Sequence, residues 1–147
     1  MAKKINFIKL RKKFGLVQED YLNDPWKVLV CCIFLNQTSH KQVRPMIKSF
    51  FKKFPTPDAV ILAIDTDNKQ MIRPIGFYNR RTTALKKFSK AYKSFNFNDD
   101  IKMLPGIGQY ASDAYNILIR GNYSIKPNDG PLNRYVDWYH KNHKHLN

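Results

Sequence analysis

The most constraining feature of the chain is a pair of glycines one residue apart, Gly106 and Gly108, within Leu104-Pro105-Gly106-Ile107-Gly108. Helical patterns lie on both sides of this segment, which predicts a hairpin between two helices over about residues 99–119. Glycine lets the backbone turn tightly and leaves amide N–H groups uncovered where the second helix starts. Such a turn can hold a phosphate oxygen of a nucleic acid without reading its sequence. The simpler interpretation is a structural turn with no ligand.

The rest of the chain also has the apolar spacing of helices, and no segment alternates convincingly with the period of a strand. Two expected helices begin with a capping side chain followed by proline, at Asp24-Pro25 and Thr56-Pro57. Because there is no repeat or long linker, we predict an all-α fold with one folded unit over residues 14–147, preceded by a basic arm at 1–13. The expected helices cover residues 26–36, 39–53, 59–64, 66–73, 79–95, 99–103, 109–119 and 131–145.

Charge narrows the class of partner. The chain has 26 Lys and Arg residues and 11 acidic residues, and this net charge of +15 on 147 residues favours a polyanion. A membrane surface is the rival polyanion, but no apolar run approaches the roughly 18 residues that a spanning helix needs, and no signal peptide precedes the first helix. Charge alone does not separate nucleic acid from other polyanions.

The two cysteines, Cys31 and Cys32, are adjacent within an apolar segment. Neighbouring residues on a helix do not readily form an ordinary disulfide, so they are predicted to be buried thiols in a reducing compartment. Two cysteines are also too few for a four-cysteine iron–sulfur cluster, which excludes that cofactor.

Four segments, in order along the chain, resemble the HhH-GPD (helix-hairpin-helix) DNA glycosylases, whose Gly/Pro-rich loop ends in an aspartate. They are residues 34–39, 75–81, 104–108 and 127–129, the last followed by Arg134. Within the family, the chain is most similar to the glycosylase domains that accompany methyl-CpG-binding domains, through residues 16–19, 24–27, 33–36, 110–113 and 132–138. It departs from that branch at Gln37, which replaces an arginine, and at Gly130-Pro131, which replaces His-Lys.

The resemblance implies two interlocked helical lobes with a DNA-binding cleft between them. It implies a base-excision enzyme that flips thymine or uracil out of a G·T or G·U mismatch and hydrolyses the N-glycosidic bond without AP-lyase activity. The implied partner is double-stranded DNA with a mismatched or deaminated base, and no membrane partner is implied. The protein is expected to be an intracellular monomer, nuclear in a eukaryote. No redox cofactor, catalytic metal or iron–sulfur cluster is implied, although a monovalent cation at the hairpin is compatible. The alternatives are an adenine-type or bifunctional glycosylase and a non-catalytic hairpin module that binds DNA.

Asp129 and Tyr110 are the candidate catalytic residues. A carboxylate near the sugar stabilises the oxocarbenium-like transition state of glycosidic cleavage and can activate water. Asp129 could instead only cap the helix that follows it, and the two roles are compatible. In bifunctional relatives, a lysine takes the place of Tyr110 and attacks the sugar. A tyrosine has no amine for a Schiff base, so the resemblance implies a monofunctional enzyme. The alternative is a tyrosine that packs on the hairpin helix.

Val17 and Gln18 are the candidate base-pocket residues, because Leu16-Val17-Gln18-Glu19 matches the family branch. The amide of Gln18 can both donate and accept, as reading the Watson–Crick edge of a flipped pyrimidine requires. A glutamine considered alone would be a solvated surface residue.

The candidate DNA contacts are of three kinds: residues of two loops, the glycines of the hairpin, and basic side chains. Gln37 would fill the gap left by the extruded base, and the loop with Ile75 and Phe77 would wedge the opposite strand. One of these two apolar residues is expected in the core, since loop residues so close rarely point the same way. Phosphate contacts are expected from Gly106, Gly108, Arg44 and Arg81, although a solvated charge is the alternative for the arginines. His140, His143 and His145 are expected in solvent and not in a metal site.

Overall fold

The computed structural model describes residues 14–142, and within that range the chain forms helices and connecting loops without a β-strand. This confirms the predicted all-helical class. The predicted basic arm at 1–13 and residues 143–147 lie outside the described part. The α-helices are α2 (Pro25–Leu35), α3 (His40–Lys53), α4 (Pro57–Leu62), α5 (Asp65–Ile72), α6 (Tyr78–Lys93), α7 (Gln109–Leu118) and α8 (Gly130–Asn142). Three short 3-10 helices join them: η1 (Val17–Tyr21), η2 (Arg73–Ile75) and η3 (Ile101–Met103).

The helices start where local signals place them. Asp24 caps α2 by accepting a hydrogen bond from the Lys27 amide at 3.3 Å. Thr56 caps α4 in the same way, through the Ala59 amide at 3.2 Å. Ser39 forms a reciprocal capping box with Gln42 at the start of α3. The predicted bounds differ from the observed ones by a residue or two at most described ends, and neither η1 nor η2 was predicted as a helix.

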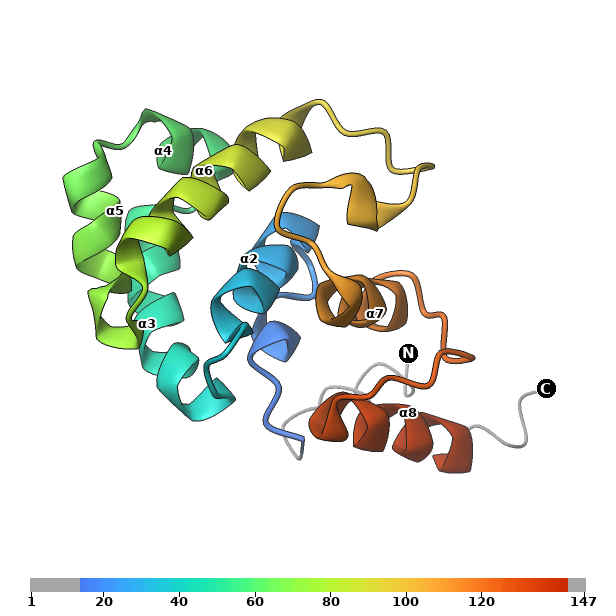
Figure 1. The fold of residues 1–147 in the computed structure, drawn as a ribbon. Coiled ribbons are helices and arrows are strands. Elements are labelled where there is room, and N and C mark those ends of the chain that lie inside the picture. The colour runs from blue at the N-terminus through green and yellow to red at the C-terminus, as the bar shows by residue number, and fades with distance from the viewer. Residues whose placement is uncertain (1–13, 143–147) are drawn as a thin grey trace.

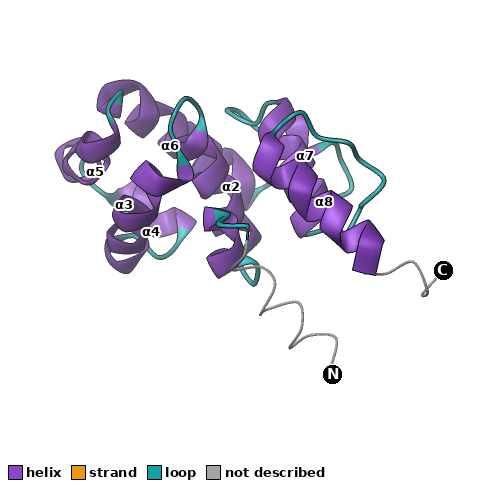
Figure 2. Ribbon diagram, turned by 90° about the horizontal axis from the view of Figure 1, so that it is seen from below, coloured by secondary structure: helices purple, strands orange, loops and turns teal. Residues whose placement is uncertain are grey.

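α2 is the centre of the core. Nine of its residues are buried, from Trp26 to Leu35, and burying a large apolar side chain contributes roughly 1.5–3 kcal/mol. The helix contacts η1, α3, α6 and α7. Figure 1 shows α3, α4, α5 and α6 gathered on one side of α2, with α7 on the other side and α8 beyond it. Figure 2 shows the same separation from below. Residues from the C-terminal end of α2 and from the start of α7 line the same cavity.

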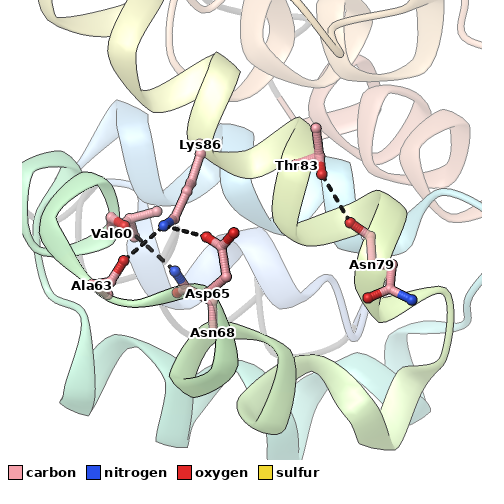
Figure 3. A network of polar contacts seen from close by, with 7 residues as sticks. All are labelled: Val60, Ala63, Asp65, Asn68, Asn79, Thr83 and Lys86. Carbon is pink, nitrogen blue, oxygen red and sulfur yellow. Dashed lines mark hydrogen bonds and ion pairs between the residues drawn. The ribbon is translucent and has the colours of Figure 1, made fainter.

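Polar contacts fasten α4 and α5 to α6 (Figure 3). The Lys86 ammonium group on α6 donates to the Ala63 carbonyl at 2.7 Å and pairs with Asp65. The buried Asn68 amide donates to the Val60 carbonyl at 3.4 Å. These bonds hold α4 and α5 together and attach them to α6, which the loop with Phe77 precedes. None of the helices within residues 14–142 is long and apolar enough to cross a membrane.

Candidate active site

A cavity of about 480 Å³ opens where the end of α2 faces the glycine hairpin. Its walls come from α2, the loop after it, the first residue of α3, the hairpin, the start of α7 and the residue before α8. The lining residues are Cys32, Leu35, Asn36, Gln37, Thr38, Ser39, His40, Gly106, Gly108, Gln109, Tyr110, Ala111 and Asp129. The structure thus brings together five residues that the sequence singled out, although they lie far apart along the chain.

Asp129 lies at the N-terminal end of α8 and lines the cavity. Its Oδ2 atom accepts a hydrogen bond from the Leu132 amide at 2.9 Å, and its backbone carbonyl accepts one from the Asn133 amide at the same distance. The predicted capping role is therefore confirmed. A helix N-terminus attracts negative charge, so this position suits a carboxylate that faces a developing positive charge. The cap fixes the carboxyl group through Oδ2, and no residue between 14 and 142 donates a hydrogen bond to Oδ1.

The hairpin uses its two glycines differently. Gly106 has a φ of +83°, a conformation that favours glycine. Gly108 has an ordinary φ of −94° and only precedes α7, and a side chain added there would meet nothing within 4 Å. Within the described chain no side chain caps α7, and its first residues line the cavity, so its first-turn amides are without a capping acceptor there. The tight turn thus depends on Gly106, while Gly108 leaves space above those amides.

Tyr110 forms the inner wall of the cavity, and Gln18 lies behind it. The Gln18 amide donates to the Tyr110 hydroxyl at 2.8 Å and to the Cys32 sulfur at 3.5 Å. Burial raises the pKa of Tyr110 well above its usual value and that of Cys32 to about 12. Both groups are therefore protonated at neutral pH. Gln18 is fully buried and does not line the cavity, and its direct contact with the base stays a prediction.

Val17 takes part in the site through its backbone amide and not through its side chain. Its side chain lies in the core and does not line the cavity, and its role in the base pocket stays a prediction. Its amide donates to Nδ1 of His40 at 3.1 Å, and the half-buried His40 ring lines the cavity with Asp129. Sequence reasoning missed His40. The available signal was a ring-bearing polar residue directly after Ser39, at the end of a segment that resembles the DNA-binding loop.

Gln37 and Phe77 face a second, smaller cavity of about 130 Å³. They are the two non-glycine residues with positive φ in the described chain, at 62° and 47°. Such conformations cost on the order of 1–3 kcal/mol each and concentrate at functional sites. Phe77 is 55% exposed and Ile75 only 8%, so one of this pair packs in the core, as expected. The exposed Phe77 is therefore the better placed of the two for a DNA contact, and the contact of Ile75 stays a prediction.

Arg81 connects the two loops that carry Gln37 and Phe77. It is 6% exposed, and its guanidinium donates to the carbonyls of Ile75 and Gly76 at 2.7 and 3.1 Å. On the other loop it donates to the carbonyl of Asn36 at 2.7 Å and to the hydroxyl of Thr38. The guanidinium is thus used by internal acceptors, and the phosphate contact of Arg81 stays a prediction.

The remaining candidates lie at the surface. Arg44 on α3 pairs with Asp20 at 3.4 Å and donates to the Gly15 carbonyl, with its side chain 43% exposed. His140 is exposed, and its ring contacts the Tyr123 carbonyl, whereas His143 and His145 lie outside the described residues. Among residues 14–142, no three His, Cys, Asp or Glu side chains gather closely enough to hold a metal ion.

Comparison with known proteins agrees with this arrangement. Residues 30–145 match the profile of the HhH-GPD superfamily of base excision DNA repair proteins. The chain is 36% identical over 129 residues to the methyl-CpG-binding domain protein 4-like protein of Arabidopsis thaliana, covering 87% of this chain and 29% of the relative. It is 37% identical over 95 residues to the thymine/uracil-DNA glycosylase of Pyrobaculum aerophilum, covering 60% and 41%. The chain thus spans less than half of each curated relative.

Two solved structures share the fold. A thermostable thymine-DNA glycosylase superposes with a TM-score of 0.62 at 24% identity, over 77% of this chain and 60% of that one. Endonuclease III, in a non-covalent complex with DNA, superposes with a TM-score of 0.56 at 19% identity, over 86% and 62%. At these identities the likeness establishes the fold alone.

Proposed function

The chain belongs to the HhH-GPD superfamily of base excision DNA repair proteins, and from this premise we propose that it is a monofunctional DNA glycosylase. It acts as an intracellular monomer on double-stranded DNA and releases thymine or uracil mispaired with guanine. The observation that carries the proposal is the single cavity in which Asp129, Tyr110, Gln37 and the hairpin meet. The thymine/uracil-DNA glycosylase activity in the name of the Pyrobaculum relative supports the choice of base.

The proposed reaction is hydrolysis of the bond between C1′ of the deoxyribose and N1 of the base. That bond breaks with its electron pair going to the base, and positive charge develops on the sugar. The Asp129 carboxylate stabilises this charge, and water adds to C1′ while losing a proton. The hairpin amides hold a phosphate of the same strand, which keeps the sugar near the carboxylate. The +15 charge of the chain attracts the duplex.

Gln37 and Phe77 have the proposed role of replacing the extruded base. Both side chains are exposed, on loops that the buried Arg81 connects, and both have strained backbones. Side chains that enter the stack from two sides compensate for the contacts that the flipped nucleotide loses. The strain is compatible with positions that are shaped for a ligand and not for stability.

The absence of strand cleavage is the first expected result. A labelled duplex with a G·T or G·U mismatch should be broken only after treatment with hot alkali, and borohydride should trap no covalent complex, because trapping requires an imine. Among residues 14–142, no lysine lines the cavity, so none of the described lysines is placed there to form such an imine. Denaturing electrophoresis with and without alkali measures both outcomes. Breakage without alkali, together with efficient trapping, would exclude the monofunctional assignment.

The Tyr110→Lys variant is the matched control for this experiment. It places an amine in the wall of the cavity that Asp129 also lines, and we expect weak trapping of this variant by borohydride, against none for the wild-type protein. No alkali-sensitive product from the wild-type protein on any mismatched duplex, despite tight binding, would favour a non-catalytic DNA-binding module instead.

Replacing both Gln37 and Phe77 by alanine should slow excision from a paired duplex at least about tenfold more than from a single strand. Extrusion costs a few kcal/mol only where stacking and pairing must be broken. Single-turnover rates on the two substrates measure the ratio. Leu62→Ala is the control, since Leu62 is 82% exposed on α4 and lines none of the cavities described here. Equal losses on both substrates would assign Gln37 and Phe77 a structural role.

A further inference from the structure

His40 lines the cavity and has one of its two ring nitrogens in a hydrogen bond. It is the first residue of α3, and its Nδ1 accepts the Val17 amide at 3.1 Å. The ring has no other hydrogen-bond partner among residues 14–142. Because the same residue lines the cavity that holds Asp129, Nε2 is the polar atom that His40 can offer to a ligand there.

The Val17 contact fixes the tautomer of the ring. An N–H group donates to Nδ1 only when Nδ1 carries a lone pair, so a neutral His40 has its proton on Nε2. Burial lowers the pKa of His40; the negative charge of Asp129 acts in the opposite direction, and Arg44 lowers the pKa further. The positive end of the α3 dipole also disfavours an imidazolium. At neutral pH the ring is therefore an uncharged donor with its N–H on Nε2.

We propose that His40 is a catalytic residue whose Nε2–H donates a hydrogen bond to a ring carbonyl oxygen of the extruded pyrimidine. The proposal rests on the glycosylase function proposed above. When the glycosidic bond breaks, the electron pair moves onto the base and spreads over its carbonyl oxygens. A fixed donor stabilises this developing anion more than it stabilises the neutral base, and this difference accelerates the reaction. His40 keeps its proton throughout, and the released base is protonated by water.

A neutral ring suits this place better than a charged one. An imidazolium so close to Asp129 would attract the carboxylate and reduce its effect on the sugar. A neutral Nε2–H assists the departing base and leaves the charge of Asp129 for the sugar. The positive charge of the transition state thus develops beside Asp129, at the start of α8, and the negative charge develops beside His40, at the start of α3.

Leaving-group dependence tests the role of His40. The duplexes carry uracil or 5-fluorouracil opposite guanine; fluorine stabilises the base anion, so this base needs a donor less. His40→Leu should lower the single-turnover rate roughly 10- to 100-fold on uracil and less than about tenfold on 5-fluorouracil. His40→Asn, which retains an N–H donor, should restore part of the loss. Affinity for a duplex with an abasic-site analogue should change less than about twofold for all variants, including the surface control His140→Leu.

Nitrogen-15 spectra of the histidine ring give a second, activity-independent measurement. They should show an unprotonated Nδ1 and a protonated Nε2 for His40, with a titration midpoint below the ordinary value of about 6.5. A proton on Nδ1 at neutral pH would overturn the proposal, as would equal losses on the two bases. A wild-type protein that releases neither base would overturn the proposed function and the role of His40 with it, whatever the tautomer.

Discussion

Asp129→Asn is expected to lower the single-turnover rate of base release by about 10³-fold or more, because the substitution removes the charge that faces the sugar. The shape of the site should survive. An asparagine oxygen can still accept the hydrogen bond that the Leu132 amide donates at 2.9 Å, and asparagine is as good a helix cap as aspartate. Affinity for a mismatched duplex and the free energy of unfolding should therefore remain close to the wild-type values. Release of the labelled base under enzyme excess measures the rate.

Asp129→Ala separates the cap from the charge. It removes both, so it should lose activity like the asparagine variant and also lower the free energy of unfolding by about 1 kcal/mol. Denaturant titration of the three proteins gives that difference. An asparagine variant within tenfold of the wild-type rate would show that the carboxylate only caps α8, and the catalytic assignment would fail.

Local signals allowed much of the fold to be predicted. The caps at Asp24 and Thr56 are decided within a few residues, and so are the apolar spacings of α2, α3 and α6. η1 was missed because it is short and has no capping side chain. Its position depends on contact with α2, which no local pattern encodes.

Site residues could be predicted where a residue type belongs to a particular loop. They could not be predicted where the role depends on how deeply the side chain is buried. Asp129, Gly106 and Tyr110 could be located from spacing and resemblance. The depth of Gln18 depends on Tyr110, 92 positions away, and the position of His40 depends on a backbone amide 23 positions away. Neither distance is encoded in the sequence around these residues. For the same reason the burial of Arg81 could not be predicted, because its acceptors lie on two separate loops.

Arg81→Met should lower the free energy of unfolding by about 3 kcal/mol, the largest effect on stability that we expect from one substitution. Methionine fills part of the space, but the carbonyls of Ile75, Gly76 and Asn36 lose their charged donor. A buried acceptor without a partner costs about 1–3 kcal/mol, and hydrogen bonds to a charged group are the stronger class. The midpoint and slope of a urea titration give the free energy.

Arg80→Met is the matched control for this loss. Arg80 is the exposed neighbour of Arg81, and its guanidinium lies 5.5 Å from the centre of the Phe77 ring. Its replacement should therefore lower the free energy of unfolding by no more than about 1 kcal/mol. Arg81→Lys should recover less than half of the free energy of unfolding that Arg81→Met loses. The compact ammonium group lacks the planar fork of donors with which the guanidinium bonds to both loops. Excision should also respond, since Gln37 and Phe77 both depend on loops that Arg81 connects. In Arg81→Lys, we therefore expect a larger loss on paired duplex than on single strands. Equal stability of the Arg80 and Arg81 methionine variants would show that the two loops hold their strained conformations without Arg81.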